Sequence, residues 1–207
     1  VCFADTDSTN IQAKLLAEQN APDGTLVCSD QQTKGRGRRG RAWDSPPGEA
    51  IYMSLLLRPD IHPEHASMLT LVMGMAVADA INELMGGESA GIKWPNDVVL
   101  KGKKVSGTLT EMSTEMDCIH YVVIGTGINV NTQKFPKELD QATSLRLAAG
   151  HNFRRAELIA LCMKYFEKYY ALFERTEDLS LLIDEYNRLL VNRNREVRVL
   201  EPGNEYT

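Results

Sequence analysis

The stretch GIKWPNDVVLKGKKVSG, residues 91–107, decides the fold class. It predicts a strand that enters Lys93-Trp94, a turn at 95–97 and a hairpin whose tip is 101–104. Another strand, predicted over 119–124, follows with no helical pattern before it. Strands that follow one another directly favour an antiparallel or mixed sheet, because a parallel pair needs a long crossover connection.

Helical patterns flank this strand-rich centre. Ser8-Thr9-Asn10 supplies N-cap chemistry for the first helix, and Gly86-Gly87 end the longest one. The predicted helices cover residues 10–19, 63–85, 154–174 and 178–191, and two further strands are predicted over 25–29 and 51–57. We therefore predict an α+β fold, a mixed and largely antiparallel sheet with helices packed mainly on one face.

The C-terminal residues predict a strand over 196–200 and a turn over 201–204. A hairpin with a single arm is not a stable end of a domain, so we expect a C-terminal segment that is missing from this sequence. We accordingly divide the chain into a main domain, residues 1–192, and the beginning of a truncated second domain, residues 193–207.

Composition excludes several classes of protein. With 43% hydrophobic and 25% charged residues, the 207-residue chain is neither disordered, fibrous nor a disulfide-stapled miniprotein. Its four cysteines are scattered, without a C-x-x-C pair or a histidine at metal-ligand spacing, which argues against zinc and fits reduced thiols in a cytoplasmic protein. No apolar run approaches the roughly 18 residues of a membrane span, so we expect no membrane association.

Positive charge is concentrated in one short loop. Five basic residues lie between Lys34 and Arg41, although the net charge of the chain is −5. This distribution indicates a local anion site rather than a broad nucleic-acid face. From charge alone, a solvated arginine-glycine loop or a nucleic-acid patch is the commoner interpretation. The neighbouring Trp43 favours a ligand site, since an indole can stack on a purine or close an apolar pocket.

The same loop contains G-x-G-x-x-G at residues 35–40, but we reject a dinucleotide-binding motif. That motif needs a strand before it and a helix at its end, whereas residues 41–47 contain two prolines and cannot begin a helix promptly. The loop is still suited to phosphate or carboxylate, because glycines allow close approach and guanidinium groups bind such anions in pairs of hydrogen bonds.

Three further clusters carry polar groups at strand ends or turns. Asn96-Asp97 suits a ribose hydroxyl or Mg²⁺ bound through water, although a plain Asx turn explains it equally. Lys104 lies near Gly107 and could meet an acid if it entered the sheet. Residues 125–129, GTGIN, are a glycine-flanked strand end whose simplest interpretation is a bulge or turn. We find no G-x-S-x-G, H-E-x-x-H or P-loop motif.

Taken together and in this order, the clusters resemble biotin protein ligase, the biotin–[acetyl-CoA-carboxylase] ligase family. The segments that carry the resemblance are 8–10, 32–43, 93–97, 103–107 and 125–129. The resemblance implies a class II aminoacyl-tRNA-synthetase-like catalytic domain followed by a small SH3-like domain, whose beginning would be the strand at 196–200.

The resemblance also implies a reaction in two steps. The carboxylate of biotin attacks the α-phosphate of ATP with Mg²⁺ on the phosphates, which gives biotinyl-5′-AMP and releases pyrophosphate. A lysine of a biotin carboxyl carrier protein domain then attacks this anhydride. The implied catalytic residues are Lys104, Arg36, Arg38 and Lys93. The implied biotin-binding residues are Ser8, Thr9, Asn10, Gln32, Arg36, Gly37, Arg38, Lys104 and Gly107. The implied ATP-binding residues are Trp43, Asn96, Asp97, Asn129 and Lys93, with Asp97 the one candidate protein ligand for Mg²⁺.

Two alternatives remain open at this point. One is a lipoate– or octanoate–protein ligase of the same superfamily. The other is a biotin-sensing regulatory or binding protein that lacks its other domains. Nucleic-acid binding by this chain is disfavoured by its net charge and by the absence of a recognition-helix pattern. A homodimer formed through a sheet edge is one option, but no residue identifies the strand.

Overall fold

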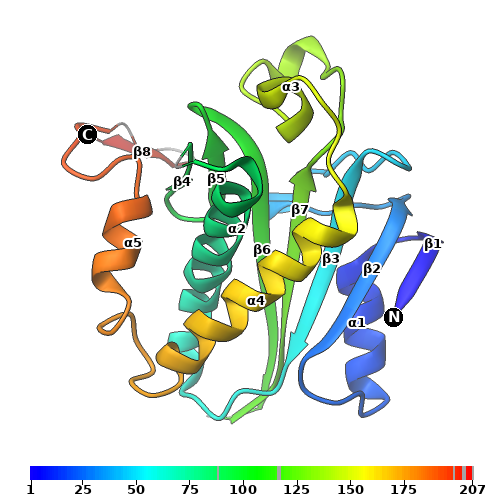
Figure 1. Ribbon diagram of the computed structural model, residues 1–207. Helices are drawn as coiled ribbons and strands as arrows, with labels where there is room; N and C mark the ends of the chain where they lie inside the picture. The colour runs from blue at the N-terminus through cyan, green and yellow to red at the C-terminus, as the bar shows by residue number, and fades with distance from the viewer. Residues whose placement is uncertain (88, 116–117, 198, 202–203, 207) are drawn as a thin grey trace.

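The computed structural model describes residues 1–87, 89–115, 118–197, 199–201 and 204–206. Its centre is a seven-stranded sheet in the order β1-β2-β3-β7-β6-β5-β4 (Figure 1). The strands are β1 (Cys2–Thr6), β2 (Thr25–Gln32), β3 (Ala50–Leu57), β4 (Ala90–Lys93), β5 (Asp97–Leu100), β6 (Lys103–Glu115) and β7 (Cys118–Asn129). β1 and β2 run parallel and every other neighbouring pair is antiparallel. The predicted α+β fold with a mixed, largely antiparallel sheet is confirmed.

The stretch 91–107 folds as its sequence predicts. β4 pairs with β5, and β5 pairs with β6 across a two-residue turn at Lys101-Gly102. Both turn residues have positive φ, 51° and 81°, which is the backbone of the type I′ turn that matches the twist of a hairpin. The register places Asp97 opposite both Lys93 and Gly107, so this hairpin brings two of the sequence motifs to one end of the sheet. The Trp94–Pro95 peptide bond between β4 and β5 is cis.

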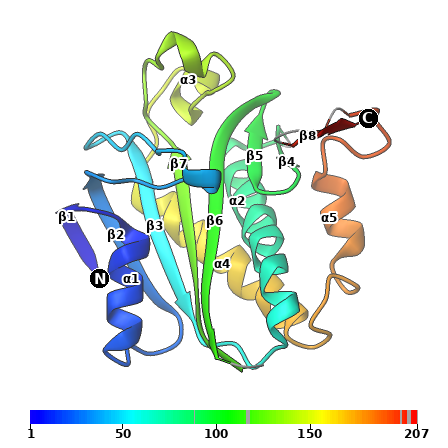
Figure 2. The same ribbon diagram turned by 180° about the vertical axis from the view of Figure 1, so that it is seen from behind.

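Helices cover both faces of the sheet, unequally. α2 (Leu69–Met85) and α4 (Arg155–Phe173) pack over one face, where α4 crosses in front of the strands in Figure 1. α1 (Thr9–Glu18) packs on the opposite face, seen from the front in Figure 2. β3 lies between these layers and is buried at all eight positions. Alternate residues of β3 therefore join the main core and the smaller core beneath α1.

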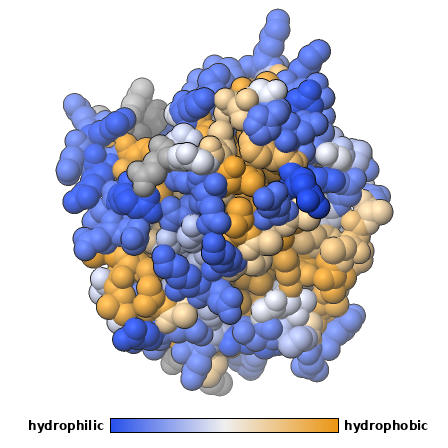
Figure 3. Space-filling view, viewed as in Figure 1, coloured by the Kyte–Doolittle hydropathy of each residue, from blue (hydrophilic) through white to orange (hydrophobic). Residues whose placement is uncertain are grey.

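One segment, Pro63–Met85, is long and apolar enough to cross a membrane by length and composition alone. It consists of a 3-10 turn, η2 (Pro63–Met68), and then α2, with Gly86 in the left-handed conformation at the C-cap. Two thirds of its most apolar window is buried inside the protein, so its place in the core accounts for its composition. Apolar side chains remain partly exposed on the α4 side, where Figure 3 shows orange surface between polar groups.

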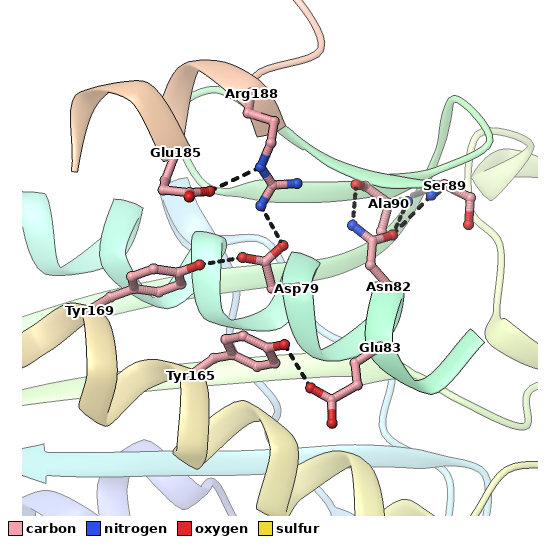
Figure 4. Close-up of polar contacts among 9 residues, drawn as sticks. All are labelled: Asp79, Asn82, Glu83, Ser89, Ala90, Tyr165, Tyr169, Glu185 and Arg188. Carbon is pink, nitrogen blue, oxygen red and sulfur yellow. Dashed lines mark hydrogen bonds and ion pairs between the residues drawn. The ribbon is translucent and has the colours of Figure 1, made fainter. Parts of the chain in front are cut away.

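A buried carboxylate joins three helices. Asp79 of α2 accepts hydrogen bonds from the hydroxyl of Tyr169 in α4 and from Arg188 of α5 (Ile183–Leu189), the latter at 2.8 Å (Figure 4). Arg188 also pairs with Glu185 at 2.9 Å. Burial, together with the bond to Asp79, raises the pKa of Tyr169, so its hydroxyl stays a donor. Beyond α5, the amide of Val191 donates to the Ile92 carbonyl at 2.9 Å, which covers part of the edge of β4.

The structure also differs from the sequence prediction. The helix predicted over 178–191 is shorter, and the strand predicted over 25–29 extends through residues 30–32 as β2. The elements that were not predicted are β1, α3 (Leu145–Ala149), η1 (Arg38–Gly40) and η3 (Lys137–Leu139). β8 (Val199–Glu201) pairs with β9 (Asn204–Tyr206), so the C-terminal hairpin has two short arms rather than one. The middle of its predicted turn, Pro202-Gly203, lies outside the described residues, and the division at residue 192 stays a prediction.

We expect Arg188→Met to lower the free energy of unfolding by about 2 kcal/mol, because Asp79 would lose a charged hydrogen-bond partner while only 8% exposed. Urea denaturation measures this difference. Arg193→Met, an exposed arginine just beyond the same helix, is the matched control and should change stability by less than about 0.5 kcal/mol. Equal losses in the two variants would show that the network does not stabilise the fold.

Candidate active site

A cleft opens on the sheet face that carries α1, beyond the N-terminal end of that helix. Its walls come from the start of α1, the end of β2, the loop 34–48, and strands β3, β6 and β7. The sequence-predicted residues that line it are Ser8, Thr9, Asn10, Gln32, Arg36, Gly37, Arg38, Trp43, Asn96, Lys104 and Gly107. Segments that are far apart in the sequence, from Ser8 to Gly127, thus meet in one place.

One end of the cleft is neutral and polar. The backbone N–H and hydroxyl of Thr9 donate to Gln32 Oε1 at 2.8 and 3.1 Å, and Gln32 Nε2 donates to the Ser45 hydroxyl at 3.0 Å. Ser8 takes the N-cap position of α1, but its hydroxyl makes no capping hydrogen bond. Ser8 and Thr9 lie at the buried start of a helix, and Gln32 is held between Thr9 and Ser45. These side chains therefore offer a ligand fixed donors and acceptors without net charge.

The floor of the cleft is bare backbone. Gly125 and Gly127 of β7 lie on the cleft side, and Gly127 faces Gly107 across the β6–β7 pair. A Cβ atom at residue 125 would lie 1.9 Å from Asn10 Oδ1, and one at residue 127 would lie 2.5 Å from Trp43 Cε2. The amide of Asn10 and the indole of Trp43 therefore lie directly on the sheet, where any side chain would displace them.

The other end of the cleft is charged. Lys104 Nζ lies 2.7 Å from Asp97 Oδ1 and 5.4 Å from the centroid of the Trp43 ring. Arg38 donates to Asn96 Oδ1 at 2.7 Å. Lys104 is 37% exposed and Asp97 24%, so water and small anions can reach this pair. The arrangement can hold an acid and polarise it while keeping the opposite, neutral end of the same molecule in place.

The basic loop folds back on itself. Arg36 and Ala42 form an isolated antiparallel bridge, and the Gly37 amide donates to the Arg41 carbonyl at 2.8 Å. Only the short 3-10 turn η1 follows, with Arg39 in the left-handed conformation at φ 57°. No α-helix starts at the end of G-x-G-x-x-G in these described residues, as the sequence of residues 41–47 predicts. The fold of the loop directs Arg36 and Arg38 toward the cleft.

Glu111 of β6 was not predicted from the sequence, yet it contacts several parts of the site. Its Oε2 accepts from Asn10 Nδ2 at 2.8 Å, and its Oε1 lies 2.7 Å from Lys14 Nζ and 3.8 Å from Arg36 Nη1. Burial by itself would raise the pKa of Glu111, but the hydrogen bonds from Asn10 and Lys14 outweigh that cost and hold the pKa below its ordinary value. The carboxylate is therefore charged and accepts hydrogen bonds at neutral pH.

Three predicted residues lie outside the cleft lining: Asp97, already placed beside Lys104, and the pair Lys93 and Asn129. Lys93 is exposed at the end of β4, opposite Asp97 in the register. Asn129 lies two positions beyond Gly127 and donates to the Thr143 carbonyl at 3.1 Å. Lys93 and Asn129 are both at the charged end of the site, beside rather than within the cleft, and their roles stay predictions.

The lining contains residues that sequence reasoning missed, including Tyr52, Met53, Thr108 and Leu109. Tyr52 and Ser54 follow an ordinary strand pattern, in which every second residue points to the cleft side, and this pattern gave no functional signal. The indole N–H of Trp43 is buried without an acceptor among the described residues. A buried donor of this kind is costly unless a ligand or water accepts from it, so Trp43 is placed to contact a polar ligand.

The residues that the structure describes build no metal site by themselves. In the part of the chain that the structure describes, no group of three or more histidine, cysteine, aspartate or glutamate side chains could hold an ion. Asp97, the candidate Mg²⁺ ligand, instead contacts Lys104 and Asn96.

This fold and site define a ligand-binding α+β domain with a neutral polar end and a cationic end in one cleft. The family model of the Biotin/lipoate A/B protein ligase family matches residues 2–129, and the chain belongs to this family. The matched region contains all five segments on which the resemblance rests, and that resemblance is confirmed.

Individual proteins that are similar to this chain agree with the family assignment. The chain is 50% identical over 166 residues to the bifunctional ligase/repressor BirA of Bacillus subtilis, covering 79% of this chain and 51% of the relative. It is 37% identical to the biotin–[acetyl-CoA-carboxylase] ligase of Mycobacterium tuberculosis, covering 69% and 53%. A structure of biotin protein ligase from Aquifex aeolicus in complex with biotin and ATP matches with TM-score 0.84 and 32% identity, over 100% of this chain and 84% of that one. The chain spans about half the length of the two curated relatives.

We expect Gly127→Ala to displace the indole of Trp43, because the new Cβ would lie 2.5 Å from its ring. Overpacking of this kind costs about 1–3 kcal/mol of stability. In a Trp94→Phe background Trp43 is the sole tryptophan, and its fluorescence should move to longer wavelength and become easier to quench. Gly87→Ala is the control, since a Cβ there meets nothing within 4 Å. Unchanged emission in the Gly127→Ala variant would contradict the proposed floor.

Proposed function

We propose that the chain is the catalytic part of a biotin protein ligase, which activates biotin as biotinyl-5′-AMP and transfers it to a lysine of a biotin carboxyl carrier protein domain. The observation that carries the proposal is the polarity of one cleft. Thr9, Asn10 and Gln32 form its neutral end, and Lys104 lies at its charged end. Biotin has the matching polarity, a neutral ureido ring and a carboxylate at opposite ends.

The charged end suits the adenylation step. A carboxylate must approach the α-phosphate of ATP, and two anions repel unless positive charge lies between them. Lys104, Arg36 and Arg38 supply that charge. Lys104 first pairs with the incoming carboxylate in place of Asp97, and then with the adenylate. Since carboxylate attack on phosphorus needs no enzyme nucleophile, the absence of a serine or cysteine nucleophile motif is consistent with this step.

The neutral end suits the ureido ring. A ring carbonyl and two N–H groups need partners once they leave water, because buried polar groups without hydrogen bonds are costly. The side chains of Ser8, Thr9, Asn10 and Gln32 supply them, and Gly37 and Gly107 leave room for the backbone to approach. The ring is thereby held while the carboxylate extends toward Lys104.

The nucleotide would lie beside Trp43, with Asn96, Asp97, Lys93 and Asn129 around it. Trp43 offers an indole face to the adenine. Mg²⁺ would enter on the triphosphate as part of the substrate, with Asp97 the nearest carboxylate, and would neutralise charge on the phosphate oxygens.

The relatives support this proposal, since they include a biotin–[acetyl-CoA-carboxylase] ligase and a biotin protein ligase in complex with biotin and ATP. We place the reaction in the cytoplasm, with the carrier domain as the protein partner and no nucleic-acid or membrane partner for this chain. A homodimer remains an option. The family name also covers lipoate ligases, so lipoate or octanoate is the alternative acid.

Biotin-dependent exchange of pyrophosphate with ATP tests the proposal. The chain is incubated with ATP, Mg²⁺ and labelled pyrophosphate, with biotin, lipoate or octanoate in parallel. We expect exchange with biotin alone. Exchange with lipoate or octanoate instead would identify the related ligase. No exchange with any of the three acids, while biotin still binds, would favour a sensing or binding role.

We expect Lys104→Ala to lower the exchange rate by about a hundredfold or more, as removal of a charge that stabilises a developing anion does elsewhere. Its pair with Asp97 is half-exposed, and such pairs add only about 0–1 kcal/mol to stability, so the melting temperature should change little. Lys103→Ala removes the neighbouring, exposed lysine of the same strand and should keep its activity. A much lower melting temperature of the Lys104→Ala variant would contradict a purely chemical role of Lys104.

A further inference from the structure

Glu111 lies at the border between the cleft and the packing of α1. On β6 it follows Gly107 and Leu109 at every second position, so it lies on the cleft side of the sheet, opposite Val123. Val123 is fully buried beneath α1. The carboxylate meets two residues one turn apart on α1, Asn10 and Lys14.

We propose that Glu111 is a positioning residue that fixes the orientation of the Asn10 side-chain amide, so that the cleft presents an oxygen of Asn10 to the N–H groups of its ligand. The inference rests on the proposed function, because it concerns recognition of the ureido ring. Glu111 itself lines no part of the cleft, and its effect on the ligand passes through Asn10.

The chemistry of the two ends of the amide decides the orientation. An ionised carboxylate has acceptors only, so it can bind the NH₂ end of Asn10 and repels the oxygen end. Asn10 Nδ2 lies 2.8 Å from Glu111 Oε2, and the hydroxyl of Ser54 lies 2.6 Å from Asn10 Oδ1. The same hydroxyl is 2.8 Å from Thr9 Oγ1, which places the oxygen end of the amide on the Thr9 side of the cleft.

The side-chain amide of Asn10 has no room to move away from Glu111. It lies flat on Gly125, where a Cβ would be within 2.8 Å of its Oδ1, Cγ and Nδ2 atoms alike. Asn10 is 4% exposed and Ser54 is fully buried. A half-turn of the amide would put its NH₂ group against Ser54 and its oxygen against Glu111, which would leave the carboxylate facing another acceptor.

Lys14 and Arg36 keep this carboxylate ionised. Lys14 forms a 2.7 Å ion pair with it, and Arg36 of the basic loop lies at 3.8 Å. The low pKa of Glu111 agrees with this geometry. The carboxylate of Glu111 therefore contacts both Asn10, at the neutral end of the cleft, and Arg36 of the basic loop.

The consequence is selectivity for ligands with an N–H group. A site built to accept such a hydrogen bond rejects an analogue without one more strongly than an apolar pocket rejects a change of size. An alkyl or dithiolane acid, which has no ring N–H, would leave Asn10 Oδ1 without its ligand donor. Binding of those acids should consequently depend little on Glu111.

Calorimetric titration of the chain with biotin in the absence of ATP tests this role. We expect E111Q to weaken biotin binding about tenfold or more, because glutamine can also donate and no longer fixes the amide. E115Q is the matched control, an exposed glutamate on the same strand that pairs with His120, and should bind as the unaltered chain does. Equal affinities of E111Q and the unaltered chain would overturn the inference.

Two further readouts distinguish the positioning role of Glu111 from a general structural effect. First, the affinity ratio of biotin to a biotin methylated on its ureido nitrogens should fall in E111Q, whereas simple loss of packing would weaken both ligands alike. Second, E111Q should cost nothing further in an Asn10→Ala background. An unchanged ratio, or additive losses in the double variant, would overturn the proposal.

Two further controls distinguish failure of the Glu111 role from misfolding of E111Q and from failure of the proposed function. If E111Q melts early, Glu111→Asp keeps the charge for Lys14 but withdraws it from Asn10, and the same loss of affinity and of selectivity is expected. Binding by Glu111→Asp as tight as that of the unaltered chain would overturn the role of Glu111. If the unaltered chain does not bind biotin, the proposed function fails and this role fails with it. If it binds biotin and E111Q binds equally, only the role of Glu111 fails.

Discussion

Three glycines on one face of two neighbouring strands are the constraint on which the cleft depends. Gly107 and Gly127 face each other across β6 and β7, and Gly125 follows on the same face. Because the backbone is bare there, Asn10 and Trp43 can lie directly on the sheet. The polar contacts at either end of the cleft then follow from where these two side chains lie. A methyl group at residue 125 would displace Asn10, and one at residue 127 would displace Trp43.

The layering of helices explains why this floor stays open. α2 and α4 fill one face of the sheet. Among the helices that the structure describes, α1 covers the other face, where it packs over β2, β3 and the first half of β7. The second half of β7 is left to the basic loop and Trp43. Polar residues at the first turn of α1 consequently border the cleft, while its later turns, with Ala13 and Ala17, pack in the core. The first turn of α1 therefore borders the cleft, and its later turns belong to the core.

The sequence predicts the fold where local chemistry determines it. The two-residue tip at Lys101-Gly102 and the direct succession of strands predict the antiparallel hairpins. β1 has a mostly exposed pattern and could be placed only by its parallel pairing with β2, a contact between distant segments. The cleft was predicted through ordered motifs, but Glu111 sits in a run of threonine, glutamate and serine that resembles any exposed strand. Its role depends on Asn10, 101 positions away, and no local pattern carries that information.

The two carboxylates of the site differ in how readily they exchange partners. Asp97 pairs with Lys104 at a half-exposed position, where an ion pair is worth about 0–1 kcal/mol, so an incoming anion can replace it at small cost. Glu111 instead holds an amide that is 4% exposed and bonded at its other end to Ser54, and losing that contact would leave a buried polar group unpaired. One end of the cleft is therefore exchangeable and the other fixed. A ligand held by its ring at the fixed end could move its carboxylate from Lys104 to a phosphate without dissociating, which is what the proposed two-step transfer through a bound intermediate requires.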